Sequence, residues 1–162
     1  MPELNPQLLD MLQEQFNLER FNAASYEAMA YNLEVVNWPG TASHFHQAAM
    51  DERDHARKFA DYLITRNAVP QVEELPAPVT VTADLYSAFD MAMQRELATG
   101  AAILALYKAA DEMEDEGLEI FLQWFITEQE ESEREYKDIL LEVGRADCSA
   151  ALLILDREYG GK

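Results

Sequence analysis

The side chains best suited to chemistry lie on helical segments, at positions where the hydrophobic pattern requires apolar residues. In the stretch MDERDHARKF, residues 50–59, Glu52 and His55 are three residues apart and therefore share one face of a helix. The rest of that face is apolar, with residues recurring at steps of three and four. Its apolar members are Phe45, Ala48, Phe59 and Tyr62. A carboxylate and an imidazole that point into a core would suit a divalent cation.

Three other segments place a polar side chain on their apolar stripe in the same way. These residues are Glu19, Glu96 and Gln129. Each lies shortly before the estimated midpoint of its segment, as Glu52 does. In a bundle of helices of matched length the midpoints share one layer, whichever way each helix runs. The pattern therefore predicts that three carboxylates, an imidazole and an amide meet in one central layer.

Buried carboxylates without partners would be costly and would take up protons. No Lys or Arg lies on the stripes to neutralise them, because Arg20, Arg53, Arg57 and Arg95 are all out of phase. Bound cations are the economical solution, and the ligand set favours Fe(II) or Mn(II) and allows Zn(II). Three carboxylates exceed the needs of one ion, so we expect two ions, about 3.5–4 Å apart, with the central Glu52 bridging them.

Tyr26 lies one heptad beyond Glu19 on the same stripe, within a turn or two of the predicted ions. Two interpretations stay open for it. It is either an ordinary aromatic core residue or a residue with a redox or hydrogen-bonding role.

Helical periodicity extends over most of the chain, and almost nothing alternates with period two. A first helix is expected from about Asn5 to about Asn37, where Trp38-Pro39-Gly40 would end it. The second helix is expected from Thr41 or Ser43 to Asn67, and the third from after Thr82, its N-cap, to about Glu114. The fourth helix is expected at about Leu118–Val143, with Gly144 ending it, and a short fifth helix at about Ser149–Tyr159.

The linker AVPQVEELPAPVTVT between the second and third helices decides the topology. It holds three prolines and no helical period, so we expect an extended segment that reaches roughly 50 Å. A helix of about 28 residues is roughly 42 Å long, so the linker can run the length of the bundle. The prediction is an all-α, single-domain architecture over residues 1–162: a four-helix bundle (about 5–144) with one long crossover between helices 2 and 3, plus a short C-terminal fifth helix (about 149–159).

Composition excludes several classes of function. The 162 residues carry 31 acidic side chains and a net charge of −19, which argues against binding of nucleic acid or an anionic membrane surface. A single cysteine, Cys148, excludes an internal disulfide framework and fits a reducing compartment. The N-terminus lacks the order of a signal peptide, and the longest apolar run, Ala150–Leu155, is too short for a membrane helix. A soluble, cytoplasmic protein is expected.

Four stretches together resemble the bacterial non-haem ferritins in order and spacing. They are LQEQFNLERF around Glu19, DERDHA with Glu52 and His55, MQRE with Glu96, and FLQWFITEQEE with Gln129. The resemblance implies that Glu19, Glu52 and His55 hold one iron and that Glu52 and Glu96 hold the second, with Gln129 nearby. It also implies a ferroxidase that oxidises Fe(II) with dioxygen or hydrogen peroxide and stores ferric mineral in a cage of 24 subunits.

Two differences from the bacterioferritin motifs bear on whether haem is expected. Bacterioferritins repeat Glu-x-x-His on the fourth helix, where this chain reads Glu128-Gln129-Glu130-Glu131. They also place a haem-ligating Met directly after the second-helix Glu, where this chain has Arg53. No haem is therefore expected.

A third iron site of bacterial ferritins would correspond here to Asp51, Glu128 and Glu131. The position that aligns with a further glutamate, one that contacts the second iron, is Ser132. This substitution puts the third site in doubt and leaves the second iron more loosely held. The alternative is that these acids form a solvated or cavity-lining face.

Two other functions compete with iron storage. A di-iron oxidase or peroxidase of the same superfamily, acting on a small substrate, would need an access cleft for an organic molecule. A non-catalytic acidic helical scaffold would bind no metal. The segment SAALLILDREYGG is too apolar for a free tail, and it would pack either on its own bundle or, as the resemblance suggests, against symmetry-related subunits.

Overall fold

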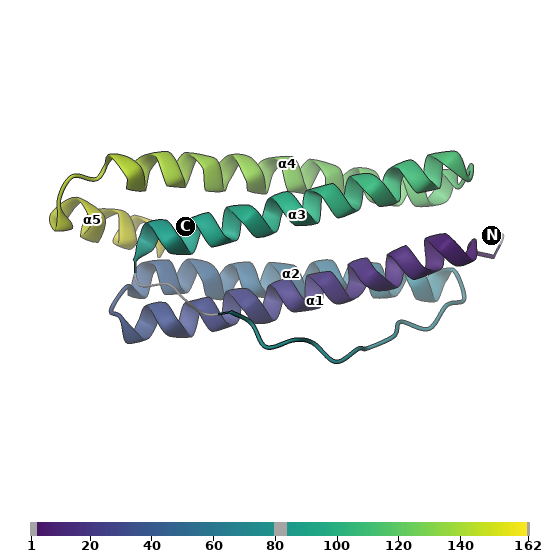
Figure 1. Cartoon of the computed structure of the whole chain (residues 1–162), viewed down its shortest axis with the longest axis horizontal. Helices are drawn as coiled ribbons and strands as arrows, with labels where there is room; N and C mark the ends of the chain where they lie inside the picture. The colour runs from purple at the N-terminus through teal and green to yellow at the C-terminus, as the bar shows by residue number, and fades with distance from the viewer. Residues whose placement is uncertain (1–2, 80–83, 162) are drawn as a thin grey trace.

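Four long helices lie side by side and a fifth, short helix lies at one end of them (Figure 1). This computed structural model describes residues 3–79 and 84–161. The helices are α1 (Pro6–Val35), α2 (Pro39–Thr65), α3 (Leu85–Glu112), α4 (Glu116–Arg145) and α5 (Ser149–Tyr159). No strand occurs within the two described ranges. The predicted all-α bundle with a short fifth helix is confirmed.

The crossover between α2 and α3 runs along the outside of the bundle, so that α2 and α3 point the same way (Figure 1). Three side chains from one face of α1 hold it in place. Gln13, Asn17 and Arg20 donate hydrogen bonds of 2.9, 2.9 and 3.0 Å to carbonyl oxygens of alternate crossover residues. Those residues are Val69, Gln71 and Glu73. The alternation is that of an extended chain, and the predicted long crossover is confirmed.

The helix boundaries differ from the expected ones at three places. Pro39 does not end α1 but occupies the first turn of α2, where proline is well tolerated. Gly144 lies inside α4, which continues to Arg145. The N-cap of α3 is Asp84, whose carboxylate accepts a 2.8 Å hydrogen bond from the backbone N–H of Ser87. Thr82, expected as this cap, lies outside the described residues.

The apolar core is divided into two clusters, one toward each end of the bundle. One cluster takes its residues from 26–33, 42–49, 85–92 and 136–143 of the four long helices, together with Tyr159 of α5. The other takes its residues from 8–16, 56–63, 103–110 and 118–125. On every long helix the segment between the two clusters carries at least one buried polar side chain. The sequence pattern therefore builds two hydrophobic ends around a polar middle layer.

Helix α5 packs on its own bundle through Asp156. The N-cap residue of α2, Trp38, makes no side-chain hydrogen bond to the first turn of the helix, and Asp156 of α5 supplies the acceptor instead. Its carboxylate accepts hydrogen bonds of 2.8 Å from both the backbone N–H and the hydroxyl of Thr41, and one of 3.1 Å from the N–H of Gly40. A Cβ on Gly40 would lie 1.7 Å from the carbonyl oxygen of Asp156, so this close approach requires glycine.

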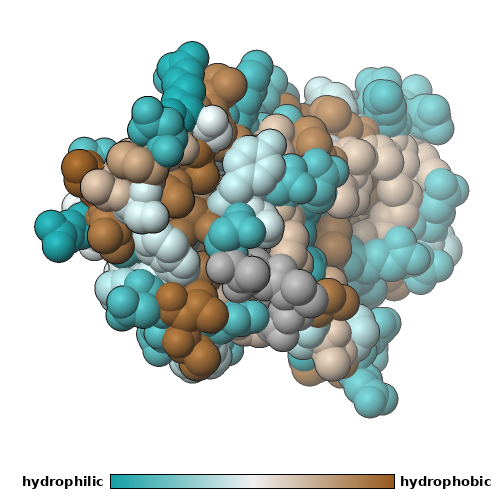
Figure 2. All heavy atoms as spheres, turned by 60° about the vertical axis from the view of Figure 1, so that its left-hand side comes forward, coloured by the Kyte–Doolittle hydropathy of each residue, from teal (hydrophilic) through white to brown (hydrophobic). Residues whose placement is uncertain are grey.

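The surface at the end of the bundle that carries α5 mixes hydrophobic and hydrophilic side chains (Figure 2). The hydrophobic ones on α5 include Leu153 and Ile154, which are 48% and 57% exposed. Within the described part of the chain, no helix combines the length and the apolar character that a membrane span requires.

Candidate metal centre

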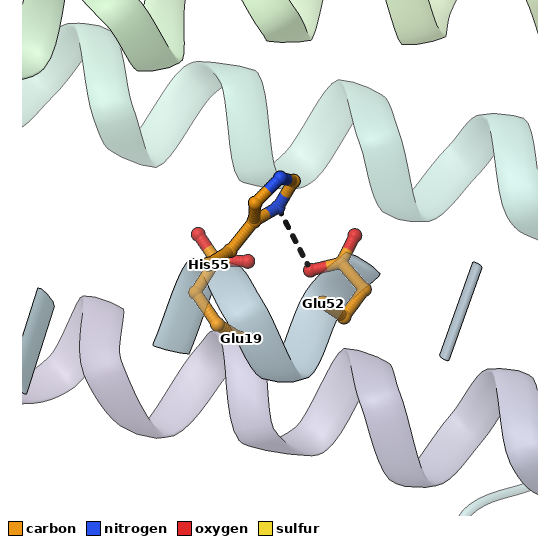
Figure 3. A group of neighbouring side chains, drawn as sticks. All are labelled: Glu19, Glu52 and His55. Carbon is orange, nitrogen blue, oxygen red and sulfur yellow. Dashed lines mark ion pairs between the residues drawn. The ribbon is translucent and has the colours of Figure 1, made fainter. Parts of the chain in front are cut away.

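Glu19, Glu52 and His55 converge in the polar middle layer (Figure 3). Glu19 comes from α1, and Glu52 and His55 come from successive turns of α2. One ligand atom from each lies within 4.8 Å of the other two, and the Nδ1 atom of His55 is 3.6 Å from Oε2 of Glu52. Glu19 is fully buried and Glu52 is 5% exposed. The predicted inward orientation of these carboxylates is confirmed.

The hydrogen bonding leaves one oxygen of each carboxylate without a protein donor. Gln15 donates a 2.7 Å hydrogen bond to Oε1 of Glu19. Among the described residues, Oε2 of Glu19 and Oε2 of Glu52 have no hydrogen-bond partner although both are buried. Buried polar atoms are normally paired, because leaving one unpaired costs about 1–3 kcal/mol. Two free carboxylate oxygens beside an imidazole fit a divalent cation of the hard or borderline kind.

Burial raises the pKa values of both carboxyl groups, Glu19 and Glu52. Removal from water raises the pKa of Glu19 well above its ordinary value, and the neighbouring Glu52 raises it further. Burial likewise raises the pKa of Glu52 to about 7. Without a bound cation these carboxyl groups therefore keep their protons to a higher pH than exposed carboxyl groups do. A cation would displace those protons, so its affinity should increase as the pH rises.

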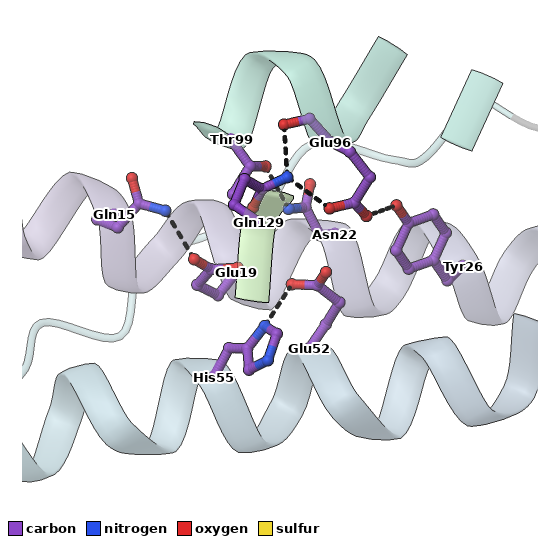
Figure 4. Close-up of polar contacts among 9 residues, drawn as sticks. All are labelled: Gln15, Glu19, Asn22, Tyr26, Glu52, His55, Glu96, Thr99 and Gln129. Carbon is purple, nitrogen blue, oxygen red and sulfur yellow. Dashed lines mark hydrogen bonds and ion pairs between the residues drawn. The ribbon is translucent and has the colours of Figure 1, made fainter. Parts of the chain in front are cut away.

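Glu96 of α3 lies in the same layer but is held by different partners (Figure 4). Tyr26 donates a short hydrogen bond to its Oε1 atom. The side-chain N–H₂ of Gln129, from α4, donates to Oε2 of Glu96 at 2.8 Å and to the backbone carbonyl oxygen of Glu96 at 2.7 Å. Burial raises the pKa of Glu96, and these two donors lower it. Both oxygens of Glu96 are therefore engaged, unlike those of the first group.

Three further polar residues support the layer, and the sequence analysis missed them. Gln15 holds Glu19, and Asn22 donates a 2.9 Å hydrogen bond to the hydroxyl of Thr99 across the bundle. All three are buried. Spacing offered a signal, because Gln15 lies four residues before Glu19 and Asn22 three residues after it on the same helix face.

A pocket of about 190 Å³ connects this layer with the surface between α2 and α4. Its lining includes Glu52, His55 and Glu96 of the site together with Ser132. Tyr26, His44 and Tyr136 add three aromatic rings to the lining. Tyr26 thus contacts both the pocket and a candidate ligand, so it is more than a passive core residue.

The acids expected at a third iron site lie around an adjoining surface pocket. Asp51, Glu128 and Glu131 line it together with His55 and Ser132. In the described ranges, the only group of three or more His, Cys, Asp or Glu side chains within coordinating distance is Glu19, Glu52 and His55. The structure therefore gathers the three acids on one face without bringing them into a ligand cluster.

Comparison with known proteins agrees with this geometry. The family described as a ferritin-like domain matches residues 9–146. The bacterial non-haem ferritin of Staphylococcus saprophyticus is 31% identical over 98% of this chain and 96% of its own length. The bacterial non-haem ferritin of Escherichia coli is 28% identical over 96% of this chain and 94% of its own length.

Solved structures give the same result. An open-pore ferritin from the archaeon Archaeoglobus fulgidus superposes with a TM-score of 0.96, at 24% identity and 99% coverage of both chains. A closed form of that ferritin, engineered by site-directed mutagenesis, gives a TM-score of 0.95 at 25% identity and covers 99% of this chain and 98% of its own. The present chain belongs to the ferritin family.

Proposed function

We propose that this protein stores iron and oxidises Fe(II) at a di-iron centre inside each subunit. Dioxygen or hydrogen peroxide would be the oxidant, and the ferric product would be stored as mineral in a cage of 24 subunits. The observation that carries the proposal is the pair of buried carboxylate oxygens of Glu19 and Glu52 that lack a hydrogen-bond donor among the described residues and lie beside His55. The bacterial non-haem ferritins to which the chain is similar support the same function.

Each residue has a distinct role in the proposed reaction. Glu19, Glu52 and His55 would bind the first Fe(II), and Glu52 and Glu96 would bind the second, with Gln129 beside it. Each Fe(II) supplies one electron, so two neighbouring ions reduce one dioxygen to hydrogen peroxide with the uptake of two protons. Carboxylate ligands favour Fe(III) over Fe(II) because of its higher charge, which assists the loss of the electron.

The size of the pocket argues against a di-iron oxidase or peroxidase that acts on a small organic substrate. A di-iron oxidase for an organic substrate needs a cleft, and ligand pockets of that kind measure roughly 300–1,000 Å³. The adjoining surface pocket of about 350 Å³ includes only His55 of the proposed ligands, and the pocket that reaches Glu52 measures about 190 Å³. Such a volume suits an ion, dioxygen or hydrogen peroxide better than an organic molecule.

Exposed apolar side chains support assembly into a larger particle. Val35 of α1 is 86% exposed and Ile64 of α2 is 56% exposed, in addition to the apolar side chains on α5. Neighbouring exposed apolar residues, such as Leu153 and Ile154 on α5, suit a contact with another subunit, whereas single ones are ordinary on a protein surface. Twenty-four copies of the 18.4 kDa chain form a particle of roughly 440 kDa. Light scattering after gel filtration should find that mass, whereas a monomer or dimer would refute the cage.

The oxidation step is tested by stopped-flow absorbance after mixing Fe(II) with air-saturated buffer. Glu52→Ala removes a ligand of both ions, so the rapid rise of ferric absorbance should be lost while the particle mass stays unchanged. Glu130→Ala is the matched control, because Glu130 is an exposed acid on α4 outside the polar layer. Oxidation by the Glu52 variant at the rate of the control would contradict the proposed centre.

A further inference from the structure

Gly100 is an unexpected residue in the middle of α3. It lies one turn after Glu96 and is buried in the bundle. Glycine inside a helix costs about 1 kcal/mol relative to alanine, and a buried alanine would also contribute apolar contacts. The backbone of Gly100 has no positive φ angle that would require glycine. The explanation must therefore be the space that a Cβ atom would occupy.

Two side chains of α4 occupy that space. A Cβ on Gly100 would lie 2.7 Å from Oε1 of Glu133 and 2.9 Å from Cγ of Gln129. Glu133 is only half-buried and ends in a flexible carboxylate, so it can move aside at little cost. Cγ of Gln129 is the first atom beyond its Cβ, and it cannot move unless the whole side chain rotates and carries the amide away. Alanine at position 100 would therefore displace the Gln129 amide.

The amide of Gln129 has a specific task where it lies. It donates to Oε2 of Glu96, while Tyr26 donates to the other oxygen of that carboxylate (Figure 4). A second cation at Glu96 would compete with these two donors for the lone pairs of the carboxylate. The first group faces less competition, because Oε2 of Glu19 and Oε2 of Glu52 accept no hydrogen bond from an amide or a hydroxyl of the described chain.

We propose that Gly100 is a positioning residue. Because glycine leaves room for the Gln129 side chain, the Gln129 amide can donate to Glu96, and in that position it opposes binding of the second cation. The two positions of the proposed centre then fill in order, the first readily and the second against the competition of the Gln129 amide. This inference rests on the proposed function, since it assumes that Glu96 is a ligand of the second ion.

The test is a calorimetric titration of chelator-treated protein with Zn(II), which cannot be oxidised and so reports binding alone. Gly100→Ala should tighten the second binding event by roughly tenfold, the equivalent of about 1.4 kcal/mol for one hydrogen bond to a carboxylate, and leave the first unchanged. Gln129→Ala should tighten the same event. In the double variant, Gly100→Ala should add nothing to the effect of Gln129→Ala, because both act through one amide.

Gly144→Ala is the matched control, because a Cβ there would come no closer than 3.9 Å to a side chain. The proposal is overturned if Gly100→Ala changes both binding events equally, changes neither, weakens the second, or keeps its effect in the Gln129→Ala background. If Gly100→Ala does not assemble, Gln129→Ala alone decides, since unchanged or weaker binding of the second ion overturns the inference. Failure of the wild-type protein to bind two ions would instead refute the proposed function.

Discussion

In the metal-free protein, replacing Glu52 with the isosteric neutral glutamine should raise stability, and the gain should grow with pH. The pKa of Glu52 rises from 4.5 to about 7 on burial, so the folded state holds a proton that the unfolded state releases. Stability is therefore lost as the pH rises from 4.5 through 7. The loss is about 3 kcal/mol near pH 8 and about 1 kcal/mol near pH 5.5.

Glutamine escapes this loss at every pH, and any cost of burying its amide does not depend on pH. The gain from Glu52→Gln should therefore be about 2 kcal/mol larger near pH 8 than near pH 5.5. For a chain of this length that difference corresponds to about 4–8 °C in Tm. Scanning calorimetry of chelator-treated protein at both pH values measures it.

Glu130→Gln serves as the control, because an exposed carboxylate should give no pH-dependent shift of Tm. An equal Tm difference between wild type and Glu52→Gln at the two pH values would refute the reasoning. It would mean that Glu52 is ionised at no cost in the folded state, and that the polar layer does not depend on a cation.

Two further predictions concern Ser132 and Asp156. Ser132→Glu adds a carboxylate to the pocket that Glu96 also lines, so the second Zn(II) should bind roughly tenfold tighter or better, and unchanged binding would show that position 132 does not reach the ion. Asp156→Ala removes the cap of α2 and should cost about 1–2 kcal/mol, or about 2–8 °C in Tm by calorimetry. Glu158→Ala, an exposed neighbour on α5, should leave Tm unchanged, and an equal loss in both variants would refute the capping role.

Sequence periodicity was sufficient to predict that Glu52 and three further candidate ligands are buried, although it missed the buried Gln15 and Asn22 beside them. Glu19, Glu96 and Gln129 occupy stripe positions on three helices, and helix geometry alone then turns each of them toward the core. The common layer followed from helix lengths, and the crossover followed from its prolines and its reach. These features are local, so one sequence is enough to infer them.

Contacts between distant segments could not be inferred in this way. The carboxylate of Asp156 caps α2 from 115 residues away, and no pattern around Thr41 indicates it. The role of Gly100 depends on the rotamer of Gln129, a residue on another helix. Glu96 accepts hydrogen bonds on both carboxylate oxygens, whereas Glu19 and Glu52 each have an oxygen without a donor in the described ranges. This difference likewise depends on hydrogen bonds between helices, which the sequence does not show.

The most direct test of the di-iron proposal is a crystal soaked in Fe(II) without oxygen and measured at the iron absorption edge. We predict two anomalous peaks in each subunit, about 3.5–4 Å apart. One should lie among Glu19, Glu52 and His55, and the other between Glu52 and Glu96. Anomalous peaks confined to surface acids, with none in the polar middle layer, would contradict the account.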